Sequence, residues 1–432
     1  MTASDPFALY VHIPFCTAKC TYCDFNSYAG QDSLMAAYTD AVVREAGLWA
    51  HHLAGRKAET VFFGGGTPSL LPIDLMERIV AALRDRFELA AAAEISLEAN
   101  PGSVDLAHLE GLRAAGFNRI SFGVQSFHGA ELRQLERIHD AREVEDAVRW
   151  AGAAGFENVN LDLIYGLAGQ SLAAWKTNLE TGLALTPAHL SLYALTLEEG
   201  TPLTRDVGRG RSAGPDLDLQ ADMFEWSRER LAAAGFRYYE VSNWARPGRE
   251  CRHNLVYWRN GDWLGLGAGA HSHLAGERFA AAASPSRYVA LVERGAAAGA
   301  PASRSTGPSS TGRAAQPGAA ALDAMPQITF REPADRAREM SETVILALRL
   351  REGLDLAAFE RRFGLPFEAA FAAPLQETLE LGLTELVQDT GSVDGSASPD
   401  HPRSEPAGGA SRLRLRDEAV LLGDEAFLRF LP

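Results

Sequence analysis

Six short apolar runs, rich in β-branched and aromatic residues, alternate with longer segments of helical periodicity in the first 200 residues of this 432-residue chain. The runs cover residues 7–13, 60–64, 94–99, 119–124, 158–166 and 189–195. Strands that alternate with helices form a parallel sheet covered by helices. Six such units suit an open barrel better than a closed barrel of eight. The sequence therefore predicts an α/β fold with a six-fold (β/α) partial barrel, whose functional residues follow the carboxyl ends of the strands.

Three of the four cysteines, Cys16, Cys20 and Cys23, follow the first run within eight residues. This spacing lets a short loop direct three thiolates toward one metal centre, and such thiolates hold iron–sulfur clusters. A cubane held by three thiolates keeps one iron without a protein ligand. Other interpretations are a core helix with three cysteines on one face, a structural zinc site completed by His12 or Cys251, and a thioredoxin-like pair of Cys20 and Cys23.

The C-x3-C-x2-C pattern, with Tyr22 before its third cysteine, resembles the signature of the radical S-adenosylmethionine (SAM) superfamily. In that family the three thiolates bind a [4Fe-4S] cluster, and the amino and carboxylate groups of SAM chelate the fourth iron. The sequence YVHIPFC further resembles the anaerobic coproporphyrinogen III oxidase-like branch. The resemblance implies a partial barrel of radical SAM type, with Cys16, Cys20 and Cys23 as the cluster ligands.

Glycines and polar residues follow the later strands. The segment GGGTP follows the second run, where glycines allow a ligand to approach the backbone closely. Glu98 ends the third run, and we expect it to point into a polar site because an unpaired buried carboxylate is costly. Without the resemblance, Arg137 could be a solvated helical charge and Asp162 a turn or cap residue. The resemblance implies that the SAM-binding positions are Tyr10, Tyr22, Gly65, Gly66, Thr67, Glu98, Gln125, Arg137 and Asp162.

The stretch from 250 to 274 is dense in aromatic residues, histidines and glycines. Its segment HNLVYW resembles the HN-x-x-YW motif of the haem chaperone subfamily, in which the histidine is implicated in haem binding. The resemblance makes His253 a haem ligand, and Tyr257 and Trp258 could supply apolar walls for the macrocycle. An isolated histidine is more often a core residue that donates to a carbonyl. Further candidates for ligation are Cys251, His271 and His273, of which the two histidines could also be turn residues.

Composition divides the chain into four parts. Residues 1–200 form the predicted barrel core, and residues 201–290 form an extension that carries HNLVYW. The segment 291–330 is rich in Ala, Gly, Ser and Pro and predicts a flexible insertion, because it cannot bury enough apolar surface to fold. Helical periodicity over 331–432 predicts a small, mainly helical C-terminal domain, for which a winged helix is one candidate, with a disordered insertion near 388–411.

The formal net charge is −15, from 41 basic and 56 acidic residues, which opposes broad contact with nucleic acid. No apolar run approaches the roughly 18 residues needed to span a bilayer, and the N-terminus does not read as a secretory signal. We therefore expect a cytoplasmic protein without a transmembrane segment or a nucleic-acid partner. A reducing compartment would keep the cluster thiols available.

Two departures separate the chain from the oxidase of the same branch. The oxidase pattern has a further cysteine two residues after the third, where this chain has Phe25, and it has a longer N-terminal segment. The resemblance therefore favours a haem chaperone that binds haem and a SAM-ligated [4Fe-4S] cluster, uses an electron donor, and transfers haem to an acceptor haemoprotein such as a membrane-associated respiratory enzyme. The alternatives are an oxygen-independent coproporphyrinogen III oxidase, which performs a radical SAM oxidative decarboxylation, and a zinc-stabilised structural protein.

Overall fold

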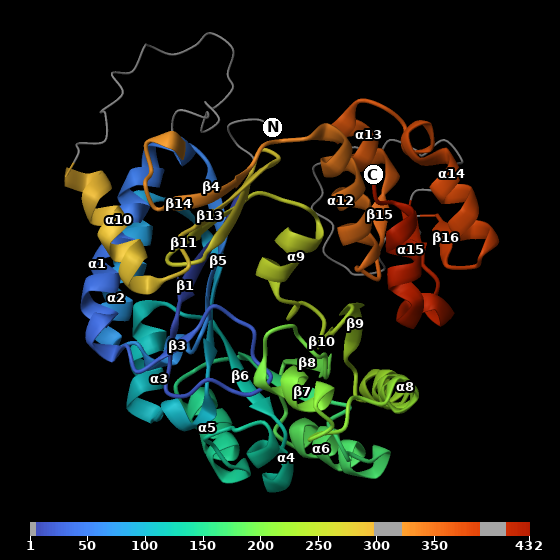
Figure 1. Cartoon of the computed structure of the whole chain (residues 1–432), viewed down its shortest axis with the longest axis horizontal. Helices are drawn as coiled ribbons and strands as arrows, with labels where there is room; N and C mark the ends of the chain where they lie inside the picture. Colours follow the sequence, from blue (N-terminus) through green and yellow to red (C-terminus); the bar gives the residue numbers. More distant parts are fainter. Residues whose placement is uncertain (1–5, 298–321, 389–411) are drawn as a thin grey trace. The chain divides into compact units, whose positions relative to one another are not determined.

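The computed structural model describes residues 6–297, 322–388 and 412–432. The chain divides into two compact units (Figure 1). The first unit comprises Met1–Arg237, Ser242–Val256 and Gly261–Ala334, and the second comprises Tyr238–Val241, Tyr257–Asn260 and Asp335–Pro432. Most of the two predicted insertions lies outside the described residues. The ends of the first insertion are ordered, because helix α10 (Pro285–Ala297) extends into it and strand β14 (Ile328–Glu332) begins before its end.

Six parallel strands form the centre of the first unit, and they confirm the six predicted runs. Each strand pairs in parallel with the next one. The order is β1 (Phe7–Ile13), β4 (Lys57–Gly65), β5 (Glu88–Ala99), β6 (Arg119–Gln125), β7 (Asn158–Tyr165) and β8 (His189–Ala194). Most residues of these strands are buried, as expected for a sheet whose apolar runs are covered by other elements. The predicted partial barrel is therefore present.

The sheet continues on both sides of these strands, to twelve strands in the order β14-β13-β12-β11-β1-β4-β5-β6-β7-β8-β10-β9. Strand β11 is a seventh parallel strand, because it pairs in parallel with β1. Strands β10, β12, β13 and β14 pair antiparallel with their neighbours. Segment 201–290, predicted as an extension, thus supplies strands to the barrel sheet. Their bounds are β9 (Arg237–Glu240), β10 (Asn243–Ala245), β11 (Trp263–Leu266), β12 (His271–Leu274) and β13 (Glu277–Ala281).

Helices connect the parallel strands and cover the sheet (Figure 1). Their ends follow local chemistry: Asp140 caps α5 in a capping box with Glu143, and α3 ends at Gly116 with φ of +106°. The helices are α1 (Met35–Ala50), α2 (Ile73–Arg86), α3 (Leu106–Ala115), α4 (Gly129–Gln134), α5 (Ala141–Ala153), α6 (Leu172–Ala184), α7 (Pro202–Gly208), α8 (Leu217–Ala233) and α9 (Arg252–Trp258). Short 3-10 helices are η1 (Asp32–Leu34), η2 (His51–Leu53), η3 (Pro68–Leu70) and η4 (Pro101–Ser103).

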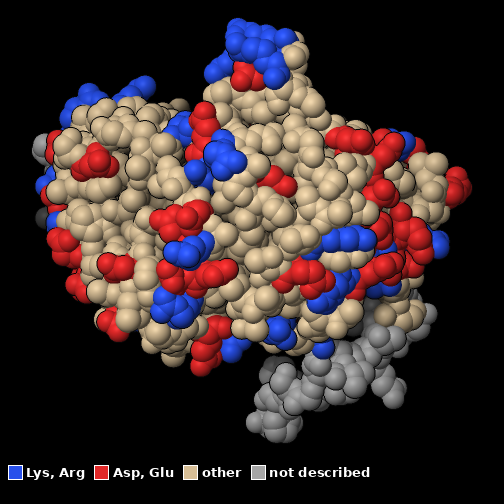
Figure 2. All heavy atoms as spheres, turned by 90° about the horizontal axis from the view of Figure 1, so that it is seen from below, with Lys and Arg blue, Asp and Glu red and all other residues tan. Residues whose placement is uncertain are grey.

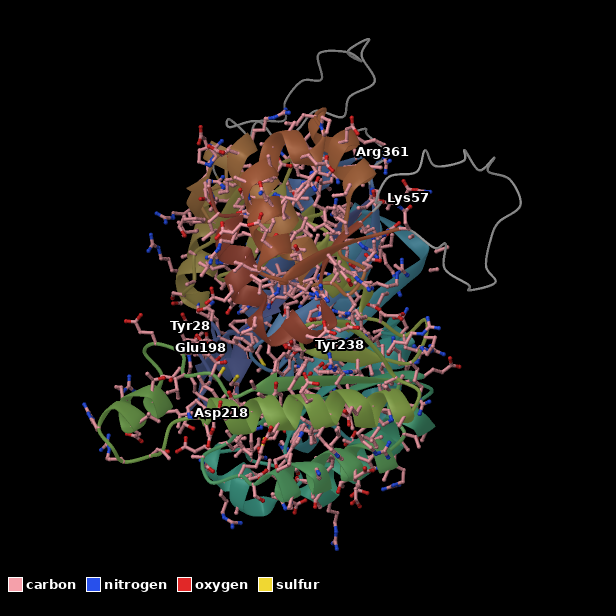
Figure 3. All side chains as sticks on the ribbon, turned by 90° about the vertical axis from the view of Figure 1, so that its right-hand side faces the viewer. Tyr28, Lys57, Glu198, Asp218, Tyr238 and Arg361 are labelled. Atoms are coloured by element: carbon pink, nitrogen blue, oxygen red, sulfur yellow. The ribbon has the colours of Figure 1, made fainter. Side chains whose placement is uncertain are left out.

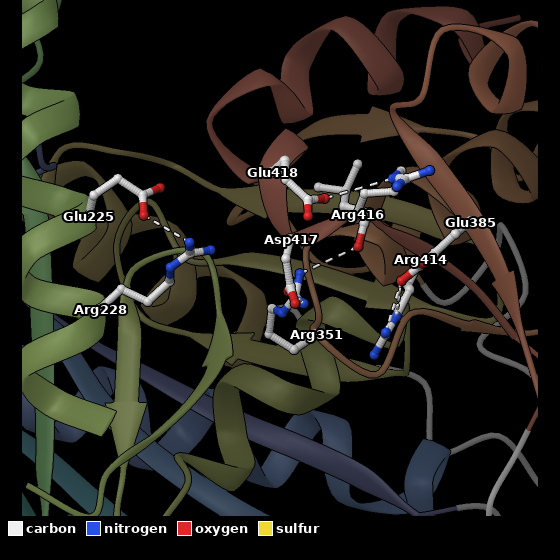
Figure 4. A network of polar contacts seen from close by, with 9 residues as sticks. Glu225, Arg228, Arg351, Glu385, Arg414, Arg416, Asp417 and Glu418 are labelled. Carbon is white, nitrogen blue, oxygen red and sulfur yellow. Dashed lines mark hydrogen bonds and ion pairs between the residues drawn. The ribbon is translucent and has the colours of Figure 1, made fainter. Parts of the chain in front are cut away.

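The second unit is mainly helical, as the sequence predicts. Its helices are α12 (Arg336–Leu348), α13 (Leu356–Phe363), α14 (Phe367–Glu380) and α15 (Gly423–Arg429), with the 3-10 helix η5 (Asp417–Leu422). A small antiparallel sheet joins β15 (Leu354–Asp355), β17 (Arg412–Leu415) and β16 (Thr384–Val387). Its core packs Phe359 against Phe363 and Phe367. The second unit also contains ion pairs of Arg414 with Glu385 and of Arg351 with Asp417 (Figure 4).

Charged side chains are mixed on the molecular face that Figure 2 shows, where acidic and basic groups lie next to one another. Neighbouring opposite charges of this kind form exposed ion pairs, such as Arg149 with Asp146 on α5. Such pairs contribute little to stability individually. In the described part of the chain, no helix combines the length and the apolar character that a membrane crossing requires.

Candidate functional site

A cavity of about 360 Å³ opens at the carboxyl ends of the parallel strands. Figure 3 shows Tyr28, just after the cysteine loop, and Glu198, after β8, at the end of the first unit opposite Lys57, which begins β4. Glu198 is one of the lining residues. Eleven of the predicted site residues line this one cavity: Cys16, Cys20, Tyr22, Cys23, Gly65, Gly66, Thr67, Glu98, Gln125, Arg137 and Asp162. The topology thus brings together residues that are up to 146 positions apart, since 162 minus 16 is 146.

The cysteine loop is fixed to the segment that follows β4. The backbone N–H of Gly66 donates to the carbonyl of Ile13 at 2.8 Å, and that of Thr67 donates to the carbonyl of Phe15 at 2.8 Å. The two short strands β2 (Phe15–Cys16) and β3 (Tyr28–Ala29) then pair in parallel and close the loop between them. These bonds hold Cys16 beside the glycine segment.

Glycine is required at two positions of this contact. Gly65 has φ of +117°, and a Cβ atom there would lie 2.5 Å from Cε1 of His12. A Cβ atom on Gly66 would lie 2.6 Å from the carbonyl oxygen of Phe15. Backbone in the left-handed region and such close approach both exclude larger residues. The GGGTP sequence therefore serves the close packing of the two loops as well as access for a ligand.

The three thiols of the loop are free and half-buried. Sγ of Cys16 lies 3.6 Å from Oγ1 of Thr67, and Arg137 donates from Nη1 to Sγ of Cys20 at 3.5 Å. Burial raises the pKa of Cys23. Among the described residues, no three His, Cys, Asp or Glu side chains converge closely enough for one metal ion. All three thiols line the one cavity, and a set of three thiolates suits a cluster in which each thiolate binds a different iron.

Arg137 links the cysteine loop to the end of β6. Its Nη2 donates to the carbonyl of Gly123 at 2.6 Å, while Nη1 faces Cys20. Its Nε is buried and has no hydrogen-bond partner in the part of the chain that the structure describes. A guanidinium carries five donors and no acceptor, so a spare buried donor beside a cavity fits an anionic group of a ligand.

Two carboxyl groups also line the cavity, those of Glu98 and Asp162. Glu98 accepts a hydrogen bond from the backbone N–H of Gly65 at 3.1 Å. Its pKa is raised to about 7, mainly by burial and secondly by the negative charge of the nearby Asp162. Asp162 accepts hydrogen bonds from Ser121 at 2.9 Å and from Asn160 at 2.8 Å. Burial raises the pKa of Asp162, although these hydrogen bonds oppose the shift. Two adjacent half-buried carboxyls attract a cationic ligand, because a positive charge relieves their repulsion.

Gln125 ends β6 in a strained conformation, with φ of +66°. A non-glycine residue in the left-handed region costs about 1–3 kcal/mol and persists only where its surroundings enforce it. The next residue, Ser126, is held by Glu131, whose Oε2 accepts hydrogen bonds from Ser126 at 2.5 Å and from Asn178 at 2.8 Å. This network fixes the turn that carries the Gln125 side chain to the cavity.

Tyr10, a predicted SAM contact, does not line the cavity. Its hydroxyl lies 2.9 Å from Nδ1 of His12, and Nε2 of His12 lies 2.8 Å from the carbonyl oxygen of Asn26. Burial lowers the pKa of His12, which favours the neutral ring. Both ring nitrogens of His12 are thus engaged within the protein. In the described structure, His12 and the remote Cys251 are not placed to complete a zinc site with the three loop thiols.

His253, the predicted haem ligand, also lies away from the cavity lining. It is only 1% exposed, and its Nδ1 lies 2.8 Å from Oγ1 of Thr60. Its ring stacks on Phe62 with the ring centroids 5.1 Å apart, and the Tyr10 ring lies 6.4 Å away. Burial, helped by the charge of Arg119, lowers the pKa of His253 to about 3. The imidazole is therefore neutral, as iron ligation requires, but it is enclosed by protein.

The other candidate ligands occupy different environments. His271 and His273 lie on strand β12, so the alternative interpretation that they are turn residues is wrong. His273 is buried, with Nδ1 at 2.9 Å from the carbonyl oxygen of Gly261. Sγ of Cys251 is buried 3.7 Å from Oε1 of Glu94, and burial raises its pKa to about 12. Trp258 belongs to the second unit, where the guanidinium of Arg349 lies 4.8 Å from its ring centroid.

Comparison with known proteins places the cysteine loop and barrel in a family. The profile of the radical SAM superfamily matches residues 10–181, and that of the HemN C-terminal domain matches residues 334–393. A protein of Mycobacterium tuberculosis named heme chaperone HemW is 42% identical over 67% of this chain and 75% of its own length. The protein of the same name from Bacillus subtilis is 32% identical over 98% of each chain. This chain belongs to the HemW family of radical SAM proteins.

The HemW family assignment agrees with the fold seen in solved structures. The coproporphyrinogen III oxidase HemN of Escherichia coli, described as a radical SAM enzyme, matches 99% of this chain and 90% of its own with a TM-score of 0.77. Sequence identity to that enzyme is 24%, so the likeness shows a common fold. The radical SAM type of the barrel and the kinship with the HemN branch, both expected from the sequence, are confirmed.

The cavity of this HemW family member also has lining residues that the sequence did not single out as binding residues. Phe25, Ile138 and Tyr193 line it and are 59%, 52% and 41% exposed. Tyr193 lies near the end of the sixth predicted strand, so the rule that functional residues follow strand ends could have found it. Ile138 directly follows Arg137 and had no comparable signal. These three side chains give the cavity an apolar rim.

Proposed function

We propose that this protein is a haem chaperone that holds a [4Fe-4S] cluster through Cys16, Cys20 and Cys23, binds SAM beside it, and uses His253 to carry haem to an acceptor haemoprotein. The proposal rests on one observation above all. Three free thiols share a cavity with the polar groups of five strand ends, in a chain 42% identical to a protein named heme chaperone HemW. The three-sulfur donor set is typical of iron–sulfur sites.

A bound cluster would supply an iron vertex for the amino and carboxylate groups of SAM and a route for electrons to it. The chain's own groups would bind and orient SAM. Arg137 has a spare Nε–H for a carboxylate, and the segment Gly65–Thr67 brings backbone close to the ligand. Glu98 and Asp162 would face the positive charge of SAM, and their ionisation on binding would strengthen the contact. The apolar rim would exclude water from the ligand.

The cluster and SAM parts of the proposal can be tested by anaerobic reconstitution of the full chain. We expect about four iron and four sulfide per chain, as for a cubane cluster. A change in the electron paramagnetic resonance spectrum of the reduced cluster on SAM addition should follow, because a new ligand reaches one iron. Stoichiometric zinc without acid-labile sulfide would instead support the zinc-stabilised structural protein.

The haem part is tested by titration with ferric haem under anaerobic conditions, followed at the Soret band. Binding by the unmodified chain and clearly weaker binding by His253→Ala are expected. Equal binding by both proteins would reject His253 as the ligand.

Conversion of coproporphyrinogen III to protoporphyrinogen IX by the reconstituted protein would overturn the chaperone assignment in favour of the oxidase. Transfer is tested by mixing the haem-loaded protein with an apo-haemoprotein and measuring the recovery of its activity.

A further inference from the structure

The described conformation encloses the side chain that the proposed function requires to bind haem. His253 is 1% exposed, and its Nδ1 is engaged by the hydroxyl of Thr60 at 2.8 Å. One face of the ring is covered by Phe62, at a centroid distance of 5.1 Å and an interplanar angle of 25°. An iron ion at the centre of a broad macrocycle cannot reach a ring in this position. Haem ligation by His253 therefore requires a different conformation of helix α9.

A second residue holds the same helix in place. Glu94 on β5 accepts hydrogen bonds from the backbone N–H groups of Arg252, at 3.3 Å, and of His253, at 3.2 Å. Its carboxylate thus satisfies two of the N–H groups that the start of a helix leaves unpaired. It is 6% exposed, and hydrogen bonds to a buried charged group are among the stronger ones. The side chain of Arg252 adds a bond to the carbonyl of Ala92 at 2.7 Å.

The two anchors lie side by side. Thr60 on β4 and Glu94 on β5 are register partners in the parallel sheet, and both side chains are buried. One binds the imidazole of His253 and the other binds its backbone, so the residue is held at both ends. A polar side chain this far inside a barrel needs such partners. The same partners keep it away from solvent.

We propose that Thr60 and Glu94 are positioning residues that hold His253 in a closed form, and that haem binds an open form in which α9 has left both anchors. This inference rests on the proposed function, since it concerns the residue proposed to ligate haem. The observed affinity for haem is then the intrinsic affinity multiplied by the fraction of open molecules. Weakening either anchor raises that fraction. Residues that never touch haem thus set how tightly it is held.

The test compares haem affinities of the full-length chain and its variants by anaerobic Soret titration with ferric haem. Thr60→Val removes one hydroxyl at nearly constant volume, and Glu94→Gln removes the charge while keeping the shape. Each should bind haem more tightly, on the order of tenfold, because a buried hydrogen bond of the closed form is lost or weakened. In a His253→Ala background, neither change should alter the affinity.

Thr39→Val is the matched control. Thr39 is also fully buried, but its hydroxyl has no hydrogen-bond partner among the described residues, so its loss should leave haem binding unchanged. Unchanged or weaker binding by Thr60→Val and Glu94→Gln, with His253→Ala still impaired, would overturn the closed form and leave the proposed function intact. Haem binding that is equally strong without His253 would overturn both.

A measurement on the unmodified protein covers the case in which a variant fails to fold. Hydrogen exchange of the backbone amides of Arg252 and His253 reports directly on the bonds to Glu94. Ferric haem should make these amides exchange at least several times faster, because the open form leaves them unpaired. Equal or slower exchange in the haem complex would reject the opening of α9.

Discussion

The cavity beside the cysteine loop and the surroundings of His253 are built on the same strands but differ in access. In the cavity, the half-buried thiols and the side chain of Arg137 line an open space of about 360 Å³. Around His253, the imidazole and the adjacent backbone are bonded to Thr60 and Glu94, and the ring is stacked on Phe62. The first site is ready for a ligand as it stands. At the second site, the imidazole that could ligate haem iron is enclosed by protein.

The difference follows from position along the strands. Cys16, Gly65 and Asp162 lie at or near the carboxyl ends, where loops leave the sheet and a cavity can open. Thr60 and Glu94 lie earlier in β4 and β5, where neighbouring strands and α9 surround each side chain. A residue at a strand end can serve a ligand directly, while a residue inside the barrel must first be released. Four predictions follow, and they test whether the cavity and the surroundings of His253 act as two independent sites or as one.

The largest effect is expected from the loss of a cluster thiol. Cys20→Ser should abolish nearly all acid-labile sulfide after reconstitution, because two thiolates cannot hold a cubane firmly. His253→Ala should retain the full iron and sulfide content, since His253 does not line the cavity. Iron and sulfide analysis of both variants makes the comparison. A loss of iron in His253→Ala as well would show that the two sites are one.

Gly65→Ala should destabilise the fold around the cavity. The residue has φ of +117°, and its new methyl group would meet the ring of His12 at 2.5 Å. We expect a loss of about 2–3 kcal/mol in the free energy of unfolding, measured by denaturant titration of the cluster-free chain. Gly152→Ala is the control, because that glycine lies in helix α5 with open space around it. It should stabilise the chain by about 0.5–1 kcal/mol.

Arg137→Gln should weaken SAM binding to the reconstituted protein by roughly 10- to 100-fold, the effect of removing a buried charged donor. The exposed Arg133 on α4 offers a matched control, and Arg133→Gln should bind SAM like the unmodified protein. Isothermal titration calorimetry under anaerobic conditions measures both. The same change should leave haem affinity unaltered, and a parallel loss of haem binding would contradict the separation of the sites.

A smaller effect is expected from pH. Burial and Asp162 raise the pKa of Glu98 to about 7, so the carboxyl is largely protonated at pH 6 and largely ionised at pH 8. Cationic SAM prefers the ionised form, so its affinity should rise with pH, by about tenfold over this range, and binding near pH 7 should release a proton. Calorimetry in buffers of different ionisation enthalpy detects that proton. Glu98→Gln should flatten the profile, and an unchanged slope would exclude Glu98 as its source.

The sequence predicts the barrel well because each strand of the parallel sheet is marked by a short apolar run in the local sequence. The run FALYVHI becomes β1 at residues 7–13, as predicted, and each of the later five runs lies in one strand of the parallel sheet or extends one residue past it. Parallel strands end at a common edge of the sheet, and this rule predicts from the sequence alone that Cys20, Glu98 and Asp162 lie close together. It could not anticipate β11, whose parallel pairing with β1 joins residues about 250 positions apart. Such pairing depends on which sheet edge remains free.

The amino-acid sequence by itself determined the cysteine spacing, the strand and helix alternation and the residues that follow the strand ends, because all of these are local patterns. Only the tertiary structure decided which of those residues share a cavity, and that Tyr10 and His253 lie outside its lining. Local sequence also cannot reveal that Thr60 and Glu94 enclose His253. The physical reason is that burial depends on what the rest of the chain packs against a residue, and those partners lie more than 150 positions away in the sequence.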